Sequence, residues 1–413
     1  MAANPSYLSK SYSANTDSFF VRLVEDIGRS LEPSDSQLAT LERSYRSTSE
    51  FLVDCPELKG HLEEVHPQGS RQLGTLTRPL RRRDGFDIDL VARMNRSAWA
   101  VYSGSAGANT LMNKLHTALT RYADQHSLRL HRWARCATLE YADGMCADIA
   151  PIIEYPHLAA LHGEHHGMIP DRELRSFHPT NPKGFSRMFS DIAAIEPNFR
   201  RIVMDSLSAE GFRKADITPL PGTEVFGRLL CRLIQMMKLH RDALFGEESV
   251  QHLRPSSILI TSLAASSYKL LAQIPHLDQL DLLLDIIRTM PTLITTRHAG
   301  YDQVEWVVDN PTAPGDNLAS CMDSPQKRQA FSQWHNKLLE DVLAVVDTVE
   351  ARAGLDQVAN QVSSAFGEKA GAALRQAQLG RQSQQRGAGK IASITGGGIA
   401  VPMTAHGHTF FGK

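Results

Sequence analysis

The stretch FDIDLV at residues 86–91 alternates apolar with acidic side chains. Alternate residues of a β-strand point to opposite faces, so Asp87 and Asp89 would share one face while Ile88 and Leu90 pack behind them. Two carboxylates that close repel each other, and one would take up a proton unless a cation lies between them. Mg²⁺ suits that position because it prefers hard oxygen ligands. Taken alone, an Asp-x-Asp pair is more typical of the solvated face of an edge strand.

Two further features flank this strand. Upstream lies Gly69-Ser70, where glycine lets backbone N–H groups approach a phosphate closely and the serine hydroxyl adds a donor. Downstream, Asp148 interrupts the apolar stretch CADIAP at residues 146–151, where an unpaired charge is costly. Each has an alternative, because a Gly-Ser pair is usually an ordinary turn and Asp148 could pair with a nearby arginine. Their order along the chain favours one shared site.

This order of motifs resembles the DNA polymerase β nucleotidyltransferase superfamily. Within it, the sequence is similar to the bacterial cGAS/DncV-like nucleotidyltransferases (CD-NTases), which make cyclic oligonucleotide signals in anti-phage CBASS operons. The early motifs are shared across the superfamily, whereas MMKLHRD followed by PSSILITSLAA resembles this family in particular. The similar stretches span most of residues 65–320 and are QGSRQLGTLTRP (68–79), DGFDIDLV (84–91), CADIAPII (146–153), NPKGFSRMF (181–189), LCRLIQMMKLHRDALF (230–245), RPSSILITSLAA (254–265) and NPTAPGDNLA (310–319).

The resemblance implies roles by position. Asp87, Asp89 and Asp148 would be catalytic and would hold two Mg²⁺ ions, with Mn²⁺ as a possible substitute. Lys238 lies where the family has a triphosphate-binding lysine; without the resemblance it would be an ordinary helix-surface lysine. Ser257 lies near a phosphate-contacting serine, although the adjacent Ser256 could fill that register instead. The nucleotide-binding residues implied in this way are Gln68, Gly69, Ser70, Lys238 and Ser257.

The implied activity is synthesis of a cyclic oligonucleotide second messenger from nucleoside triphosphates. A 3′-hydroxyl attacks the α-phosphate and pyrophosphate leaves; the linear product then reorients, and a second transfer closes the ring. Two alternatives use the same residues, an RNA-tailing or protein-nucleotidylating transferase and a catalytically silent nucleotide-binding protein. The formal net charge of −1 disfavours a stable long nucleic-acid partner, because gripping its phosphates usually requires a basic excess.

We predict an α+β fold, in which a polymerase β-like nucleotidyltransferase palm has a mixed sheet, an N-terminal bracing helix and a C-terminal helical domain. Residues 14–55 have helical periodicity, and Asp143-Gly144 suits the turn of a hairpin that carries Asp148. After about residue 185 the periodicity is nearly all helical. The expected parts are a catalytic domain with N-terminal helices (1–200), a helical domain closing the nucleotide cleft (201–354) and a flexible tail rich in Gln, Ser, Gly and Ala (355–413).

Cysteine content and hydropathy bear on the setting of the protein. Five widely spaced cysteines without a CxxC pair suggest reduced thiols in the cytoplasm. No apolar run approaches the length of a membrane span, so no membrane partner is expected.

The C-terminal residues 408–413, HTFFGK, suggest a further partner. In many operons of this family a ubiquitin-like conjugation pair acts on the enzyme's own C-terminus. A flexible tail ending in aromatic residues and glycine would suit such enzymes, although Lys413 departs from a plain C-terminal glycine and would need trimming. The alternative is an ordinary frayed terminus.

Overall fold

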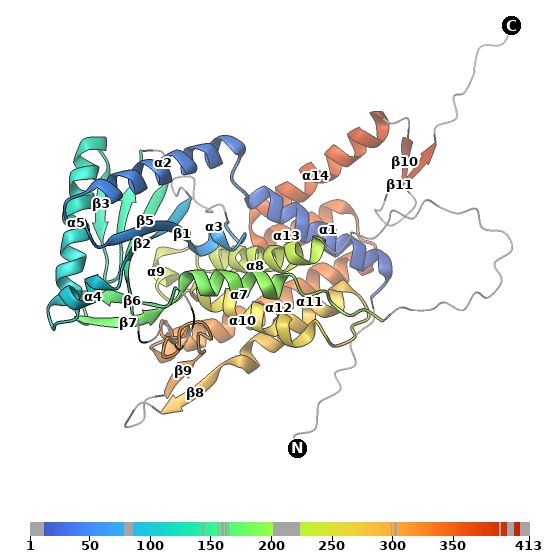
Figure 1. Cartoon of the computed structure of the whole chain (residues 1–413). Helices are drawn as coiled ribbons and strands as arrows, with labels where there is room; N and C mark the ends of the chain where they lie inside the picture. Colours follow the sequence, from blue (N-terminus) through green and yellow to red (C-terminus); the bar gives the residue numbers. More distant parts are fainter. Residues whose placement is uncertain are drawn as a thin grey trace, which may run out of the picture.

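The computed structural model has a β-sheet with its covering helices at one end and a bundle of helices at the other (Figure 1). It describes residues 12–77, 86–142, 144–155, 157, 161, 163, 165–200, 224–298, 300, 304–387, 390–394 and 400–404. In that part of the chain, no helix is both long enough and apolar enough to cross a membrane.

The sheet is mixed, as predicted. Strand β2 (Asp87–Met94) pairs antiparallel with β1 (Leu62–Gln68) and parallel with the central strand β5 (Cys146–Glu154). The remaining pairs are antiparallel, and the strand order is β1-β2-β5-β4-β3. The other strands are β3 (Arg129–Arg132), β4 (Ala137–Glu140), β6 (Gly167–Asp171), which pairs with β5, and β7 (Ser176–Thr180), which pairs with β6.

One face of this sheet is buried. Ile88 and Leu90 are 1% and 0% exposed, as expected for alternate residues that point into a core. The helices α2 (Asp35–Asp54) and α5 (Gly107–His126) cover that face, contributing among others Leu41 and Leu115 to the same cluster. The acidic residues of β2 and β5 therefore project from the opposite face.

The predicted hairpin between β4 and β5 forms. The Tyr141 N–H donates to the Met145 carbonyl oxygen at 2.8 Å, and Gly144 has a φ of 82°, which suits glycine. Asp143, the expected partner of Gly144 in the turn, lies outside the described residues. Two short helices complete this half, α3 (Gly69–Gln72) and α4 (Ser97–Tyr102).

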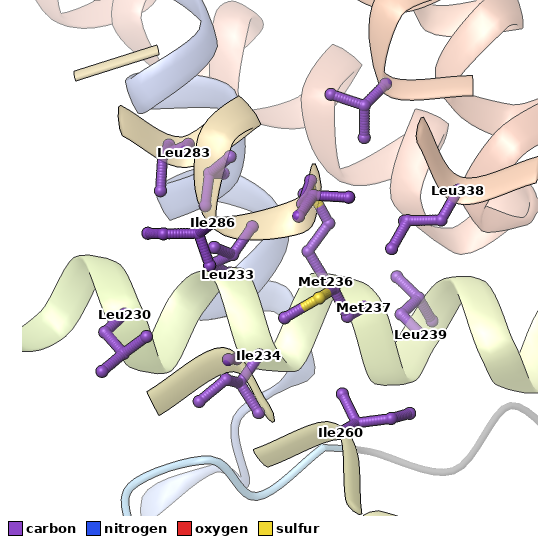
Figure 2. Packing of buried hydrophobic residues seen from close by; sticks show 14 of the residues in the cluster. Leu230, Leu233, Ile234, Met236, Met237, Leu239, Ile260, Leu283, Ile286 and Leu338 are labelled. Carbon is purple, nitrogen blue, oxygen red and sulfur yellow. The ribbon is translucent and has the colours of Figure 1, made fainter. Parts of the chain in front are cut away.

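The helical half is built around α8 (Glu224–Leu244). Figure 2 shows Leu233, Ile234 and Met237 of α8 within a cluster that also includes Ile260 and Ile286 from other helices. Its other elements are α7 (Pro182–Ala193), α9 (Glu248–Gln251), α10 (Ser257–Leu271), α11 (Gln279–Thr289), the 3₁₀ helix η1 (Met290–Leu293), the hairpin of β8 (Thr295–His298) and β9 (Val304–Val307), and α12 (Pro325–Glu350).

The prediction of a flexible tail from residue 355 is wrong for residues 355–387. These residues form α13 (Leu355–Phe366) and α14 (Glu368–Gly387). Val358, Val362 and Phe366 recur every four residues and are 3%, 0% and 1% exposed in the helical core. Alanine and glutamine are good helix formers, so a composition that suggests disorder still folds when one face is apolar. A hairpin of β10 (Lys390–Ile394) and β11 (Ala400–Thr404) follows, and residues 405–413 lie outside the described residues.

The expected domain boundary near residue 200 also differs from the packing. The bracing helix of the sheet is α2, whereas α1 (Ala14–Leu31) buries Phe20 and Ile27 in the helical core. Phe189 of α7 joins the same core. The hydrophobic period of an amphipathic helix identifies its buried face but not the element that it packs against, so the two cores exchange segments across the expected boundary.

Candidate active site

The register of β2 and β5 brings the predicted acids together. Asp89 is the Cα partner of Asp148 in this parallel pair, and Asp87 lies two residues before Asp89, on the same face. The buried residues that follow them, Leu90 and Ile149, are also partners in the register. Packing of the core therefore fixes the alignment of the acids on the other face.

Burial and mutual repulsion raise the pKa of Asp89 to about 7. Desolvation is the largest cause, followed by the negative charges of Asp148 and Asp87. Lys238 and a hydrogen bond from the Ser70 backbone N–H act in the opposite direction. The site thus holds more negative charge than its own cations balance, which is the condition that favours a bound divalent ion.

Gly69 and Ser70 lie directly beside these acids. Gln68, the last residue of β1, is the Cα partner of Asp89, so the chain leaves the sheet next to that carboxylate. Gly69 has a φ of 69°, and a Cβ at this position would lie 1.9 Å from Oδ2 of Asp89. Only glycine permits both this backbone conformation and this close approach.

Lys238 is not the surface lysine of the alternative interpretation, because it is 2% exposed. Its Nζ donates to the hydroxyl and the carbonyl oxygen of Thr75, at 2.9 and 3.2 Å. Burial, and then the charge of Arg241, lower the pKa of Lys238 to about 7, while Asp242 and Asp89 oppose that shift. Lys238 is therefore close enough to interact with the acids and also anchors the loop that follows Gly69-Ser70.

Two more residues of α8 hold the same loop. Gln235 donates its side-chain N–H to the Leu76 carbonyl oxygen at 2.7 Å, and the Cys231 thiol donates to that of Leu73 at 3.5 Å. Cys231, Gln235 and Lys238 follow one another at intervals of four and then three residues, so they lie on one face of α8. The helical half thereby positions the Gly-Ser segment against the sheet.

Ser256 and Ser257 make different contacts in the structure. Ser256 is the N-cap of α10, and its hydroxyl accepts from the Leu259 N–H. The Ser257 hydroxyl instead accepts from Arg241 Nη1 at 2.9 Å. Arg241 also influences the pKa of Lys238, so Ser257 is connected to the site through Arg241, one turn beyond Lys238 on α8.

Thr138 contacts Asp148 and was not among the residues predicted from the sequence. It is the Cα partner of Asp148 in the β4–β5 pair, and its hydroxyl donates to Asp148 Oδ1. Burial raises the pKa of Asp148, and this hydrogen bond lowers it in part. The connection between β4 and β5 is longer than the two-residue turn Asp143-Gly144. The sequence therefore did not show which residue lies opposite Asp148.

The three carboxylates fit divalent metal ions by their chemistry. They supply hard oxygen donors, and the pKa of Asp89 is raised first by burial and then by the negative charges of Asp148 and Asp87, a repulsion that a cation would relieve. Among the described residues, no three His, Cys, Asp or Glu side chains are already arranged around one metal position. Asp148 Oδ1 is held by Thr138 and Asp89 Oδ2 lies against Gly69. Mg²⁺ in such sites commonly takes its remaining ligands from substrate phosphates and water.

The chain is similar in sequence to proteins that make cyclic nucleotides. Residues 18–192 match the family model of the Second Messenger Oligonucleotide or Dinucleotide Synthetase domain. The chain is 24% identical over 371 residues to a c-di-GMP synthase of Roseivirga ehrenbergii, covering 88% of this chain and 89% of the relative. It is 24% identical over 359 residues to the cyclic dinucleotide synthase CdnG of Bradyrhizobium diazoefficiens, covering 84% of this chain and 79% of the relative.

The fold also matches a solved structure. The CD-NTase CdnG of Bradyrhizobium diazoefficiens, in complex with GTP, superposes with a TM-score of 0.60 at 20% identity, over 86% of this chain and 97% of that one. The fold of the chain is therefore similar to that of a CD-NTase, residues 18–192 match the synthetase domain, and most of the chain is similar in sequence to a c-di-GMP synthase and a cyclic dinucleotide synthase.

Proposed function

We propose that this protein synthesises a cyclic oligonucleotide second messenger from nucleoside triphosphates and that it acts in anti-phage defence. The observation that carries the proposal is the pairing of Asp89 with Asp148 beside Gly69 and Ser70. The two curated relatives are cyclic dinucleotide synthases by name, and they support a cyclic product over an RNA tail or a nucleotidylated protein.

Each acidic residue has a proposed role. Asp87, Asp89 and Asp148 would hold two Mg²⁺ ions, for which Mn²⁺ could substitute; when bound, these ions stabilise negative charge on the α-phosphate and pyrophosphate. The attacking 3′-hydroxyl oxygen bonds to the α-phosphorus, and the bond between that phosphorus and the pyrophosphate oxygen breaks. A carboxylate oxygen of Asp148 takes the hydroxyl proton, a role that its raised pKa favours.

The remaining residues would bind and orient the triphosphate. Gln68, Gly69 and Ser70 would contact it, because this segment leaves β1 directly beside Asp89, and backbone N–H groups of such a segment can bind phosphate oxygens. Lys238 would supply a positive charge from α8, and it already interacts with Asp89. Ser257 would contribute through Arg241, to which it is hydrogen-bonded. The protein thus mainly positions its substrates and neutralises their charge.

The test is product analysis with purified protein. The protein and Mg²⁺ are incubated with each labelled nucleoside triphosphate alone and with pairs of them. The products are then treated with phosphatase and analysed by mass spectrometry. A phosphatase-resistant oligonucleotide without free ends is expected, and it should be absent with Asp87→Ala and Asp89→Ala. A long ladder would indicate tailing instead, and no transfer at all would indicate a silent nucleotide-binding protein.

We also propose that a ubiquitin-like conjugation pair acts on the C-terminus. The proposal rests on the family resemblance and on residues 408–413, which lie outside the described residues. Mass spectrometry of the protein from cells carrying the full operon should find the end trimmed to Gly412 and conjugated. An intact, unmodified Lys413 in those cells would contradict the proposal.

A further inference from the structure

Trp133 is a large aromatic residue that stays exposed beside the proposed catalytic acids. It begins the turn between β3 and β4, where its N–H donates to the Cys136 carbonyl oxygen at 3.0 Å. Its side chain is 56% exposed, whereas Trp334 is fully buried at 0%. The indole N–H is hydrogen-bonded to Thr138, so this exposed ring is held one residue away from Asp148.

The strand register puts Trp133 on the same face as the acids. Arg132 pairs with Ala137, so Trp133 and Cys136 lie opposite each other at the next position. Their side chains point to the same face of the sheet as that of Thr138, because alternate residues of a strand share a face. Thr138 in turn pairs with Asp148. A second observation agrees with this placement: the pKa of the Cys136 thiol is raised to about 12, first by burial and then by the charges of Asp148 and Asp89.

A chain of hydrogen bonds fixes the orientation of the indole ring. Trp133 Nε1 donates to the Thr138 hydroxyl oxygen at 2.8 Å, and that hydroxyl donates to Asp148 Oδ1. The polar edge of the ring is thus tied to the acid that accepts the proton in the proposed reaction. The ring is held in one position while more than half of the side chain remains open to solvent, which is the property of a stacking surface.

The strand order indicates which nucleotide would meet this surface. The order β1-β2-β5-β4-β3 puts Gly69 and Ser70 at the β1 side of the acids and Trp133 at the β4 side. A donor nucleotide with its triphosphate at Gly69-Ser70 therefore lies on the side away from Trp133. This placement leaves the β4 side, next to Asp148, for the nucleotide that supplies the attacking hydroxyl.

We propose that Trp133 stacks on the base of this acceptor nucleotide and so holds the nucleotide beside Asp148. The inference rests on the proposed function, since it assigns a residue to one of the two nucleotides of that reaction. Aromatic stacking tolerates any base and is strongest for the larger rings, so the expected ligand class is a purine nucleotide. Trp133 is then a positioning residue for the acceptor, held in place by Thr138.

Intrinsic fluorescence tests the stacking directly, without turnover. The probes are 2′,3′-dideoxy-GTP and 2′,3′-dideoxy-ATP with Mg²⁺, which lack the hydroxyl needed for attack. Binding should quench the fluorescence of the natural protein and of the control Trp99→Phe, whose native ring packs against Tyr155 and Phe177. Trp133→Phe should lose the nucleotide-dependent quench. The same quench in Trp133→Phe would overturn the proposal.

Steady-state kinetics separate stacking from a purely structural role. Trp133→Ala and Trp133→Phe both remove the N–H that Thr138 accepts, but only the alanine variant removes the aromatic face. Loss of stacking should raise the KM of Trp133→Ala about 5- to 150-fold and change kcat little. Trp133→Phe should stay near the natural KM, and equal loss of kcat in both variants would overturn the proposal.

The two proposals fail in different ways. A quench at Trp133 without any cyclic product would refute the proposed function and leave nucleotide stacking intact. Cyclic product with an unchanged KM in Trp133→Ala would refute the stacking alone.

Discussion

Replacement of Gly69 by alanine tests the contact between the Gly-Ser segment and the acids. The new Cβ would lie 1.9 Å from Asp89 Oδ2, and real Cβ contacts are essentially never below 3.0 Å. The carboxylate oxygen or the backbone must therefore move by about 1 Å. A displacement of that size in a catalytic group lowers the rate by roughly 100-fold, which corresponds to about 2.7 kcal/mol of transition-state stabilisation.

Gly60→Ala is the matched control. Gly60 has a φ of 83°, close to the 69° of Gly69, but a Cβ added at Gly60 would have nothing within 4 Å. Both variants carry the backbone penalty of a left-handed conformation, roughly 1–2 kcal/mol. They should therefore lose similar thermal stability, while only Gly69→Ala should also lose activity.

The assay is the initial rate of pyrophosphate release, with the melting temperature of each variant measured in parallel. The expected result is a kcat/KM about 100-fold lower for Gly69→Ala and nearly unchanged for Gly60→Ala. Full activity in Gly69→Ala would refute the reasoning, because it would mean that Asp89 need not keep its position against the glycine. Equal loss in both variants would trace the effect to general destabilisation.

Three further predictions concern protons and metal ions. Thr138→Val removes the hydrogen bond that lowers the pKa of Asp148. The acidic limb of the pH–rate profile should therefore move to higher pH, and kcat/KM should fall roughly tenfold near neutral pH. The control Thr138→Ser should keep the natural profile. The pKa of Lys238 falls from 10.5 to about 7 on folding, so the cost of burying its charge is full below pH 7 and is relieved as the pH rises toward 10.5. Urea unfolding should show the free energy of unfolding rising between these pH values. Lys238→Met should lack that part of the rise. The pKa of Asp89 is raised from 3.8 to about 7, so the metal-free protein loses the corresponding stability as the pH rises from about 4 to 7, and Mg²⁺ must compete with the proton. The increase in melting temperature caused by Mg²⁺ should accordingly be larger at pH 8 than at pH 6, and Asp89→Asn should abolish this difference.

Alternation and turn chemistry were enough to predict the strands β2, β4 and β5 around the acids. The pattern of FDIDLV identified β2 and its two faces, and Gly144 marked the hairpin that leads into β5. Sequence order alone could not fix the pairing of Asp89 with Asp148, because β2 and β5 are separated by more than 50 residues of other elements. That pairing depends on the core behind the strands, where Leu90 and Ile149 align.

Other parts of the site depend on contacts between segments that the sequence keeps far apart. Lys238 could be located by resemblance, but its hydrogen bonds to Thr75 arise only when α8 packs against the loop after Gly69-Ser70. Thr138 was not predicted because its importance follows from strand register. The helices at residues 355–387 were missed because small and polar residues hide a short apolar repeat, which becomes visible as a buried face only against α8 and α12.

The central claim is that Asp87, Asp89 and Asp148 share divalent cations next to a nucleotide triphosphate. The most direct measurement is anomalous X-ray scattering from crystals of the protein with Mn²⁺ and a 2′,3′-dideoxynucleoside triphosphate. The account predicts Mn²⁺ peaks bridging the carboxylates of β2 and β5 to the phosphates, with the triphosphate against Gly69 and Ser70. A triphosphate bound elsewhere, or three carboxylates without Mn²⁺ at saturating concentration, would contradict it.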